Sequence, residues 1–136
     1  MESLLDWYIP KRIIISRPIG EQTIETVEEN NGNLLKLLDA GKAPIHIILD
    51  ARHITKVPTS LLKLSNATSF LKHPAIGWVV AITNDPLIKF IAGMLPQIGS
   101  LKHNRVMSEP ANCLAFLKEQ DQTLDWSIAN HDLFPL

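Results

Sequence analysis

Ile45-His46-Ile47-Ile48-Leu49-Asp50 is a nearly continuous apolar run that ends in a carboxylate. Its β-branched residues are typical of a central parallel strand, which other elements cover on both faces. A polar stretch over 51–58 follows, and then Thr59-Ser60-Leu61-Leu62. Thr59 and Ser60 each carry a hydroxyl that can cap a helix, so a helix is predicted to start there. That helix would begin at the carboxyl edge of the sheet, where the sites of open α/β folds lie.

The remaining apolar runs predict further strands around this central one. Runs over 4–9 and 12–16 flank Pro10-Lys11 and predict a hairpin or one bent edge strand. Two more strands are predicted over 77–83 and 104–107. The runs 45–49 and 77–83 are the most continuous, so we expect them at the centre of the sheet.

Amphipathic spacing and helix-start signals predict four helices. They are expected over 22–40, from Pro58 to about Lys72, from Pro86 and from Pro110. Weak helix formers over 28–33 could hold a kink in the first of them. Strands separated by single helices imply parallel pairing with right-handed crossovers. We therefore expect an α/β fold with a mixed sheet of about four to five strands and about four helices.

The chain has 136 residues, 46% of them hydrophobic, which is enough for one core and too little for two. We expect a domain over 1–120 and an apolar C-terminal extension over 121–136. The extension contains Leu124, Trp126, Ile128, Leu133 and Phe134. Because it is too apolar for a disordered linker, we expect it to pack on the body or on a second copy, which would give a homodimer.

Charge and composition narrow the classes of partner. The formal net charge is -1, and Lys and Arg look scattered along the sequence, so nucleic acid is not an expected partner. No apolar run approaches the roughly 20 residues of a membrane span, so no membrane insertion is expected. The first residues carry acid where a signal peptide carries base, and the single cysteine, Cys113, fits a reducing compartment. We expect a cytoplasmic protein.

Motifs for common cofactors and catalytic centres are missing from the sequence. Its five histidines are dispersed, so neither a metal nor a cofactor is expected: His46, His53, His73, His103 and His131. Asp50, His53 and Ser60 could cluster as a hydrolase triad, but a strand-ending carboxylate more often accepts loop hydrogen bonds. We therefore do not expect an enzyme.

The element order, with Asp50 ending the central strand and a hydroxyl pair at the next helix start, resembles the STAS family of sulfate-transporter and anti-sigma-factor-antagonist domains. In that family, an aspartate-serine-serine-glycine type motif presents a phosphorylatable Ser or Thr at the helix N-terminus. Thr59 and Ser60 match the hydroxyl positions, whereas Pro58 replaces the acidic residue and Leu61 the glycine. The resemblance covers about Ile13 to Leu117 and is greatest to divergent, free-standing bacterial members.

This resemblance implies a non-enzymatic regulatory module that docks a protein partner, such as a kinase or an anti-sigma factor. The docking surface would run from Asp50 to Leu62, with Ser60 and Thr59 as candidate phosphoacceptors. The expected partner-binding residues are Asp50, Arg52, His53, Thr59, Ser60 and Leu62. The alternative is a domain that binds a small molecule or lipid at the same strand edge, with the apolar helix over 87–95 lining the pocket.

Overall fold

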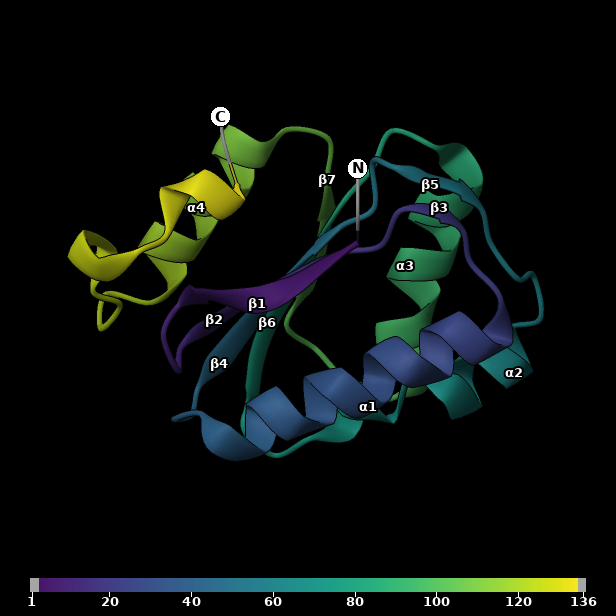
Figure 1. Ribbon diagram of the computed structural model, residues 1–136, viewed down its shortest axis with the longest axis horizontal. Coiled ribbons are helices and arrows are strands. Elements are labelled where there is room, and N and C mark those ends of the chain that lie inside the picture. The colour runs from purple at the N-terminus through teal and green to yellow at the C-terminus, as the bar shows by residue number, and fades with distance from the viewer. Residues whose placement is uncertain (1–2, 135–136) are drawn as a thin grey trace.

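The computed structural model describes residues 3–134, and its centre is a five-stranded sheet in the order β1-β2-β4-β6-β7 (Figure 1). The first two strands form an antiparallel hairpin, and the other neighbours pair in parallel. The strands are β1 (Leu4–Ile9), β2 (Ile13–Arg17), β4 (Ile45–Asp50), β6 (Ile76–Ile82) and β7 (Asn104–Met107). The α/β fold with a mixed sheet is thus confirmed, and β4 and β6 each have a strand on both sides.

Helices cover both faces of this sheet (Figure 1). One face carries α1 (Ile24–Ala40), α2 (Leu61–Ala67) and α3 (Pro86–Ile98), and the other carries α4 (Pro110–Gln120) with the C-terminal segment. Successive residues of β4 serve opposite faces, since Ile47 packs in the cluster with α1 and Ile48 packs in the cluster with α4. Burial on both faces is the reason that this strand is apolar at nearly every position.

The helix predicted from Pro58 to Lys72 is wrong in its extent. Helix α2 ends at Ala67, and a separate 3₁₀ helix spans Ser69–Lys72. Thr68 breaks the helix, because its backbone leaves the helical region and its hydroxyl donates to the Leu64 carbonyl (2.8 Å). The side chain of Asn31 then accepts from the Phe70 amide (2.7 Å) and so fixes the new turn. Helix α1 runs without interruption through the residues that could have held a kink.

A second, two-stranded sheet was not predicted. It pairs β3 (Gly20–Glu21) with β5 (Ile54–Lys56) in parallel. Strand β5 lies inside the stretch over 51–58 that was expected to be a polar loop. Both strands are too short to give a period-two pattern, so the sequence carries no signal for them. Gly20 has a φ of 81°, a conformation that glycine adopts without steric cost. This small sheet holds the segment after Asp50 beside the start of α1.

The C-terminal segment packs on the body of the same chain. Leu124 and Phe134 are buried in the core cluster that also contains Tyr8 and Leu117. The Asn130 amide donates to the Tyr8 carbonyl (2.8 Å), and the Tyr8 hydroxyl lies 2.7 Å from His131 Nδ1. The segment therefore closes the α4 face of the sheet. Residues 1–2 and 135–136, which belong to the predicted domain and extension, lie outside the described residues.

Candidate functional site

Asp50, at the carboxyl end of β4, is fully buried beneath two arginines. Its Oδ2 accepts from Arg17 Nε (2.8 Å) and Arg52 Nη2 (2.9 Å), and its Oδ1 accepts from Arg52 Nε (2.8 Å). Burial alone would raise the pKa of Asp50, but the hydrogen bonds from Arg52 and Arg17 outweigh it and lower the pKa to about 2. The carboxylate is therefore ionised at neutral pH and fully engaged.

Arg17 connects this cluster to the C-terminal segment. Its Nη2 donates to the Leu133 carbonyl (2.7 Å), while the Arg52 guanidinium lies 6.0 Å from the Phe134 ring centroid. Asp50 thus positions Arg52 at the surface and does not itself reach a partner, which corrects its expected direct contact. Arg17 was missed in the sequence, although β2 pairs in parallel with β4 and so ends beside Asp50.

The other predicted site residues lie along β5 and the start of α2. Ser60 is the N-cap of α2, and its Oγ accepts from the Lys63 amide (3.2 Å), while Thr59 is exposed just before it. His53 is half-buried, and its carbonyl accepts from the Gly20 amide (2.9 Å). Leu62 is the most exposed of the large apolar residues, at 73%. The structure therefore brings Arg52 to Asp50 and presents Thr59, Ser60 and Leu62 together at the helix start.

A hydrolase triad is not what these residues form. The Asp50 oxygens accept from the two arginines, and the Ser60 hydroxyl oxygen accepts from a backbone amide. A triad needs the carboxylate to orient the imidazole and the imidazole to bond the hydroxyl. Asp50 and Ser60 instead hold structural positions at the edge of the sheet.

Helix α3 adds an apolar surface beside α2. Leu87 is 48% exposed and Phe90 is 56% exposed, although both are large hydrophobic residues. Asp85 caps this helix by accepting from the amides of Leu87 (2.9 Å) and Ile88 (3.1 Å). The two helices pack against each other, so the exposed side chains of α2 and α3 belong to adjacent elements.

Charge is also unevenly distributed between the helices. Residues 51–105 carry seven Lys and Arg side chains but one acidic side chain, Asp85, whereas the rest of the chain carries six basic and thirteen acidic ones. The basic side chains are spread along the chain, as expected, whereas the acidic ones are nearly absent from residues 51–105. Lys63 on α2 and Lys89 on α3 are exposed, whereas α1 exposes Glu25 and Glu28.

An apolar cavity of about 140 Å³ lies between the sheet and the layer of α1, α2 and α3. Ala81 lines it from β6, Pro58 from the segment before α2, and Ile91 from α3. The cavity is adjacent to the helix start that the sequence singled out. The ligand-binding alternative expected a pocket there, lined by the helix over 87–95, and Ile88, Ile91 and Leu95 of that helix line the cavity.

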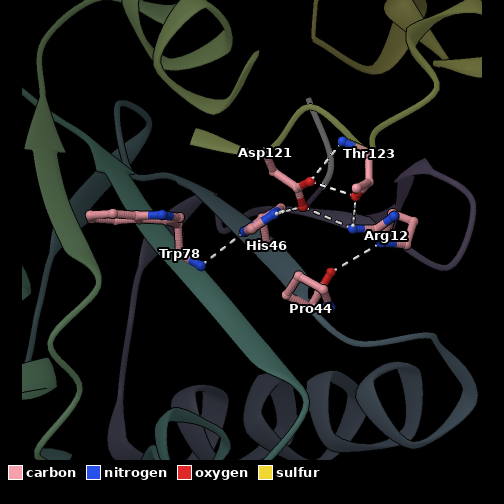
Figure 2. Close-up of polar contacts among 6 residues, drawn as sticks. All are labelled: Arg12, Pro44, His46, Trp78, Asp121 and Thr123. Atoms are coloured by element: carbon pink, nitrogen blue, oxygen red, sulfur yellow. Dashed lines mark hydrogen bonds and ion pairs between the residues drawn. The ribbon is translucent and has the colours of Figure 1, made fainter. Parts of the chain in front are cut away.

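A second charged cluster lies at the opposite end of β4, around His46 (Figure 2). The Trp78 amide donates to His46 Nδ1 (2.9 Å), so the ring proton is on Nε2, which donates to Asp121 Oδ2 (2.8 Å). Arg12 Nη2 also donates to Asp121 Oδ2 (2.8 Å), and Thr123 donates to Oδ1 of the same carboxylate.

The environment of this cluster shifts both titratable groups. Burial lowers the pKa of His46, against the opposing effect of its hydrogen bond to Asp121, so the imidazole is neutral. Burial would raise the pKa of Asp121, but hydrogen bonds from Thr123 and His46 lower it to about 2. Because both ring nitrogens of His46 are engaged, the cluster anchors the end of α4 to the sheet, as expected of a core histidine.

Two further observations concern metals and membranes. Within residues 3–134, no group of three or more His, Cys, Asp or Glu side chains is placed to hold a metal ion. None of the helices described is both long enough and apolar enough to cross a membrane.

Cys113 is buried. Its burial, and to a lesser extent the charge of Asp50, raises the pKa of the thiol to about 12.

Comparison with known proteins identifies the fold. No protein-family model matches the sequence, and no curated protein matches it. The structure is similar to the solved structure of the anti-sigma factor antagonist SpoIIAA in its unphosphorylated form, with a TM-score of 0.58 and 12% identity. The match covers 86% of this chain and 96% of that one. The chain therefore has a STAS-like fold, as the order of its elements predicted.

Proposed function

We propose that this protein is a non-enzymatic regulatory module that docks a protein partner through the start of α2 and the adjacent face of α3. The observation that carries the proposal is the exposure of large apolar side chains on these two short, neighbouring helices. Leu62 and Phe90 are each more than half exposed and stand on helices that pack against each other, and exposed apolar side chains that gather into a patch mark interaction sites. We call the surface formed by Thr59, Ser60, Leu62, Leu87 and Phe90 the α2–α3 surface.

The charges around the α2–α3 surface indicate the chemistry of the partner. Lys63 and Lys89 are exposed on the two helices, and the one acidic side chain of this half of the chain, Asp85, is engaged in capping α3. Two lysines therefore face one carboxylate on these helices, so an approaching acidic surface would meet a net positive charge there. Electrostatic complementarity of this sort mainly speeds association and excludes wrong partners. A kinase or an anti-sigma factor with an apolar patch rimmed by Asp and Glu fits this surface.

Ser60 and Thr59 remain candidate phosphoacceptors within this proposal. Both are exposed and lie at the edge of the α2–α3 surface. A phosphate adds a charge of about -1.5 to -2, which would reverse the local positive potential and weaken docking of an acidic partner. Since Pro58 and Leu61 depart from the family motif, the capping role of Ser60 is the better supported one.

The proposal also includes the expected cytoplasmic location and the expected self-association. A cytoplasmic location fits the single, buried and unoxidised Cys113. Self-association through the C-terminal segment has less support, because Leu124 and Phe134 are buried within their own chain. Among the described residues of this segment, Ile128 is the large apolar one that is exposed, at 53%.

The experiment compares the proteins that three immobilised forms of this protein capture from a cell extract. The three forms are wild type, Leu62→Ser and Ile128→Ser. Each variant removes one exposed apolar side chain, so Ile128→Ser is a matched control on the opposite side of the sheet. We expect mass spectrometry to find a partner retained by wild type and Ile128→Ser and lost from Leu62→Ser. Retention of the same proteins by all three forms would contradict docking at α2.

The partner found in this way allows a test of the switch. Calorimetry with wild type, Ser60→Asp and Ser60→Ala measures the effect of charge at the helix start separately from the loss of the cap. We expect Ser60→Asp to weaken binding and Ser60→Ala to leave it unchanged. Equal affinity of wild type and Ser60→Asp would exclude phosphate control at this position.

A further inference from the structure

The cavity under α2 and α3 has an apolar lining that comes from four elements. Its walls include Val27 of α1, Leu64 of α2, Ile88 of α3 and Val79 of β6. These side chains are at most half exposed, and most of them are buried. The cavity is partly open to solvent, and its volume of about 140 Å³ is close to that of an engineered apolar cavity of about 150 Å³ that binds benzene.

Polar side chains reach the cavity at few places, and each is already engaged. Asn30 Nδ2 donates to Ser16 Oγ (3.2 Å), and the Thr68 hydroxyl donates to the Leu64 carbonyl (2.8 Å). Gln22 Nε2 donates to the Ile19 carbonyl (3.2 Å). The guanidinium of Arg105 stacks on Trp78 (5.4 Å) and Phe116, which pack in the core cluster of the α4 face, away from the cavity.

We propose that this cavity is a binding site for a small, uncharged, apolar molecule or for an apolar group of that size. The lining is mainly apolar and its polar side chains are already hydrogen-bonded or stacked, so a polar ligand would lose more hydration than the cavity replaces. The volume limits the buried part of the ligand to about the size of a monocyclic hydrocarbon. This inference concerns the interior of the helical layer and goes beyond docking at its outer surface.

Occupancy of the cavity would also act on the α2–α3 surface, and this part of the inference rests on the proposed function. Helix α2 has seven residues, so its position depends on packing through Leu64 more than on its own helical stability. Leu64 faces the cavity, and Leu62 on the same helix is exposed. A ligand in contact with Leu64 would therefore order the helix that presents Leu62 to a partner.

The test titrates the full chain with benzene, phenol and benzoate, and follows methyl NMR signals of labelled Ile, Leu and Val. We expect saturable shifts for benzene at Leu64, Ile88 and Val79, and none at Leu117 on the other face of the sheet. Phenol should bind about tenfold more weakly and benzoate not at all, because the cavity offers no partner for a hydroxyl or a charge. Tighter binding of benzoate, or no saturable shift with benzene, would overturn the proposal.

Two filling variants and one control locate the site. Ala92→Leu adds bulk to the cavity from α3, and Ala115→Leu makes the same change at an exposed position of α4. We expect benzene to bind Ala92→Leu about tenfold more weakly, with Ala115→Leu unchanged, and Ala81→Val serves as a second filling variant if Ala92→Leu fails to fold. Unchanged binding in a folded filling variant would overturn the assignment of the ligand to this cavity.

Amide hydrogen exchange in α2 then reports the coupling. Benzene should slow exchange over Leu61–Ala67 in the wild type and not in the filling variant. If benzene binds but the exchange rates over α2 do not change, the proposed coupling to α2 is wrong, while the assignment of the binding site still holds. None of these measurements uses a protein partner, so failure of the docking proposal would not affect their outcome.

Discussion

The two faces of the sheet are built differently, although one set of strands supplies both. On the α4 face, large side chains such as Tyr8, Leu117 and Phe134 are almost completely buried, and the C-terminal segment closes the core. On the face of α1, α2 and α3, a cavity of about 140 Å³ remains, and Ile88 and Ile91 are each 8% exposed. Both faces therefore have a buried core, as Leu38 and Ile47 show on the second face, but only that face combines the core with a cavity beneath exposed apolar side chains of α2 and α3.

Residue size and helix length explain the difference. Ala81 on β6 and Ala92 on α3 stand in a lining that is otherwise mostly of larger apolar residues, and larger side chains at these two positions would fill part of the cavity. The covering helix α2 is short and ends at Ala67, with Thr68 as its C-cap. Two charged clusters hold the α4 face instead, because Asp50 is connected through Arg17 to Leu133 and Asp121 is connected to His46.

The largest expected effect comes from truncating one leucine on each face. Leu117→Ala on the α4 face should cost about 3–5 kcal/mol, because the side chain is fully buried in tight packing. Leu64→Ala should cost about 2 kcal/mol, since a side chain beside a cavity already lacks contacts on one side. Urea unfolding of both variants measures the difference. Equal losses would mean that the two faces are equally well packed.

Removal of the Asp50 charge tests whether the Asp50 cluster stabilises the packing of the C-terminal segment through Arg17. Asp50→Asn should cost about 3 kcal/mol, because two arginines would lose their partner at a buried site. Asp39→Asn is the control, since that carboxylate is 74% exposed and pairs with His73, so its loss should cost less than about 1 kcal/mol. Urea unfolding at pH 7 gives the loss in free energy of unfolding for both variants. Similar losses would show that the Asp50 cluster does not stabilise the fold more than an exposed ion pair does.

Acid should weaken the α4 face in two stages. His46 has a lowered pKa, so its contribution to stability is complete above its ordinary value of 6.5 and falls as the pH drops below it. Asp50 and Asp121 have pKa values of about 2 in place of 3.8, so their contributions are complete above about pH 4 and are lost towards pH 2. The free energy of unfolding, measured in urea from pH 8 to pH 3, should show both stages.

A His46→Gln variant separates the two stages. The decrease below pH 6.5 should disappear in this variant, because glutamine does not titrate, while the decrease below pH 4 should remain. A decrease of unchanged size between pH 6.5 and pH 5 would assign the first stage to another group.

The smallest effect is expected at the helix cap on the cavity face. Ser60→Ala removes the oxygen that accepts from the Lys63 amide and should cost about 0.5–1 kcal/mol. Ser65→Ala is the matched control within the same helix, because the Ser65 side chain makes no hydrogen bond within residues 3–134. Thermal unfolding compares the two, and an equal shift in Tm would exclude a specific capping role for Ser60.

The sequence by itself determined the architecture of the sheet. The apolar runs over 45–49 and 77–83 can be satisfied only by strands that are covered on both faces, and this placed β4 and β6 at the centre. The hydroxyl at Ser60 predicted the start of α2, because capping depends on residues that are close in the chain. The STAS-like fold came from the resemblance of this element order to a known family, not from the local patterns alone.

Only the tertiary structure decided the contents of the site. Arg17 reaches Asp50 and His46 reaches Asp121 across 33 and 75 residues of sequence, and no periodic pattern records such contacts. The cavity is the space left by side chains from several elements, so its volume depends on their packing and not on any one of them. Periodicity reports which face of an element is buried, whereas the fit between elements is a property of the assembled fold.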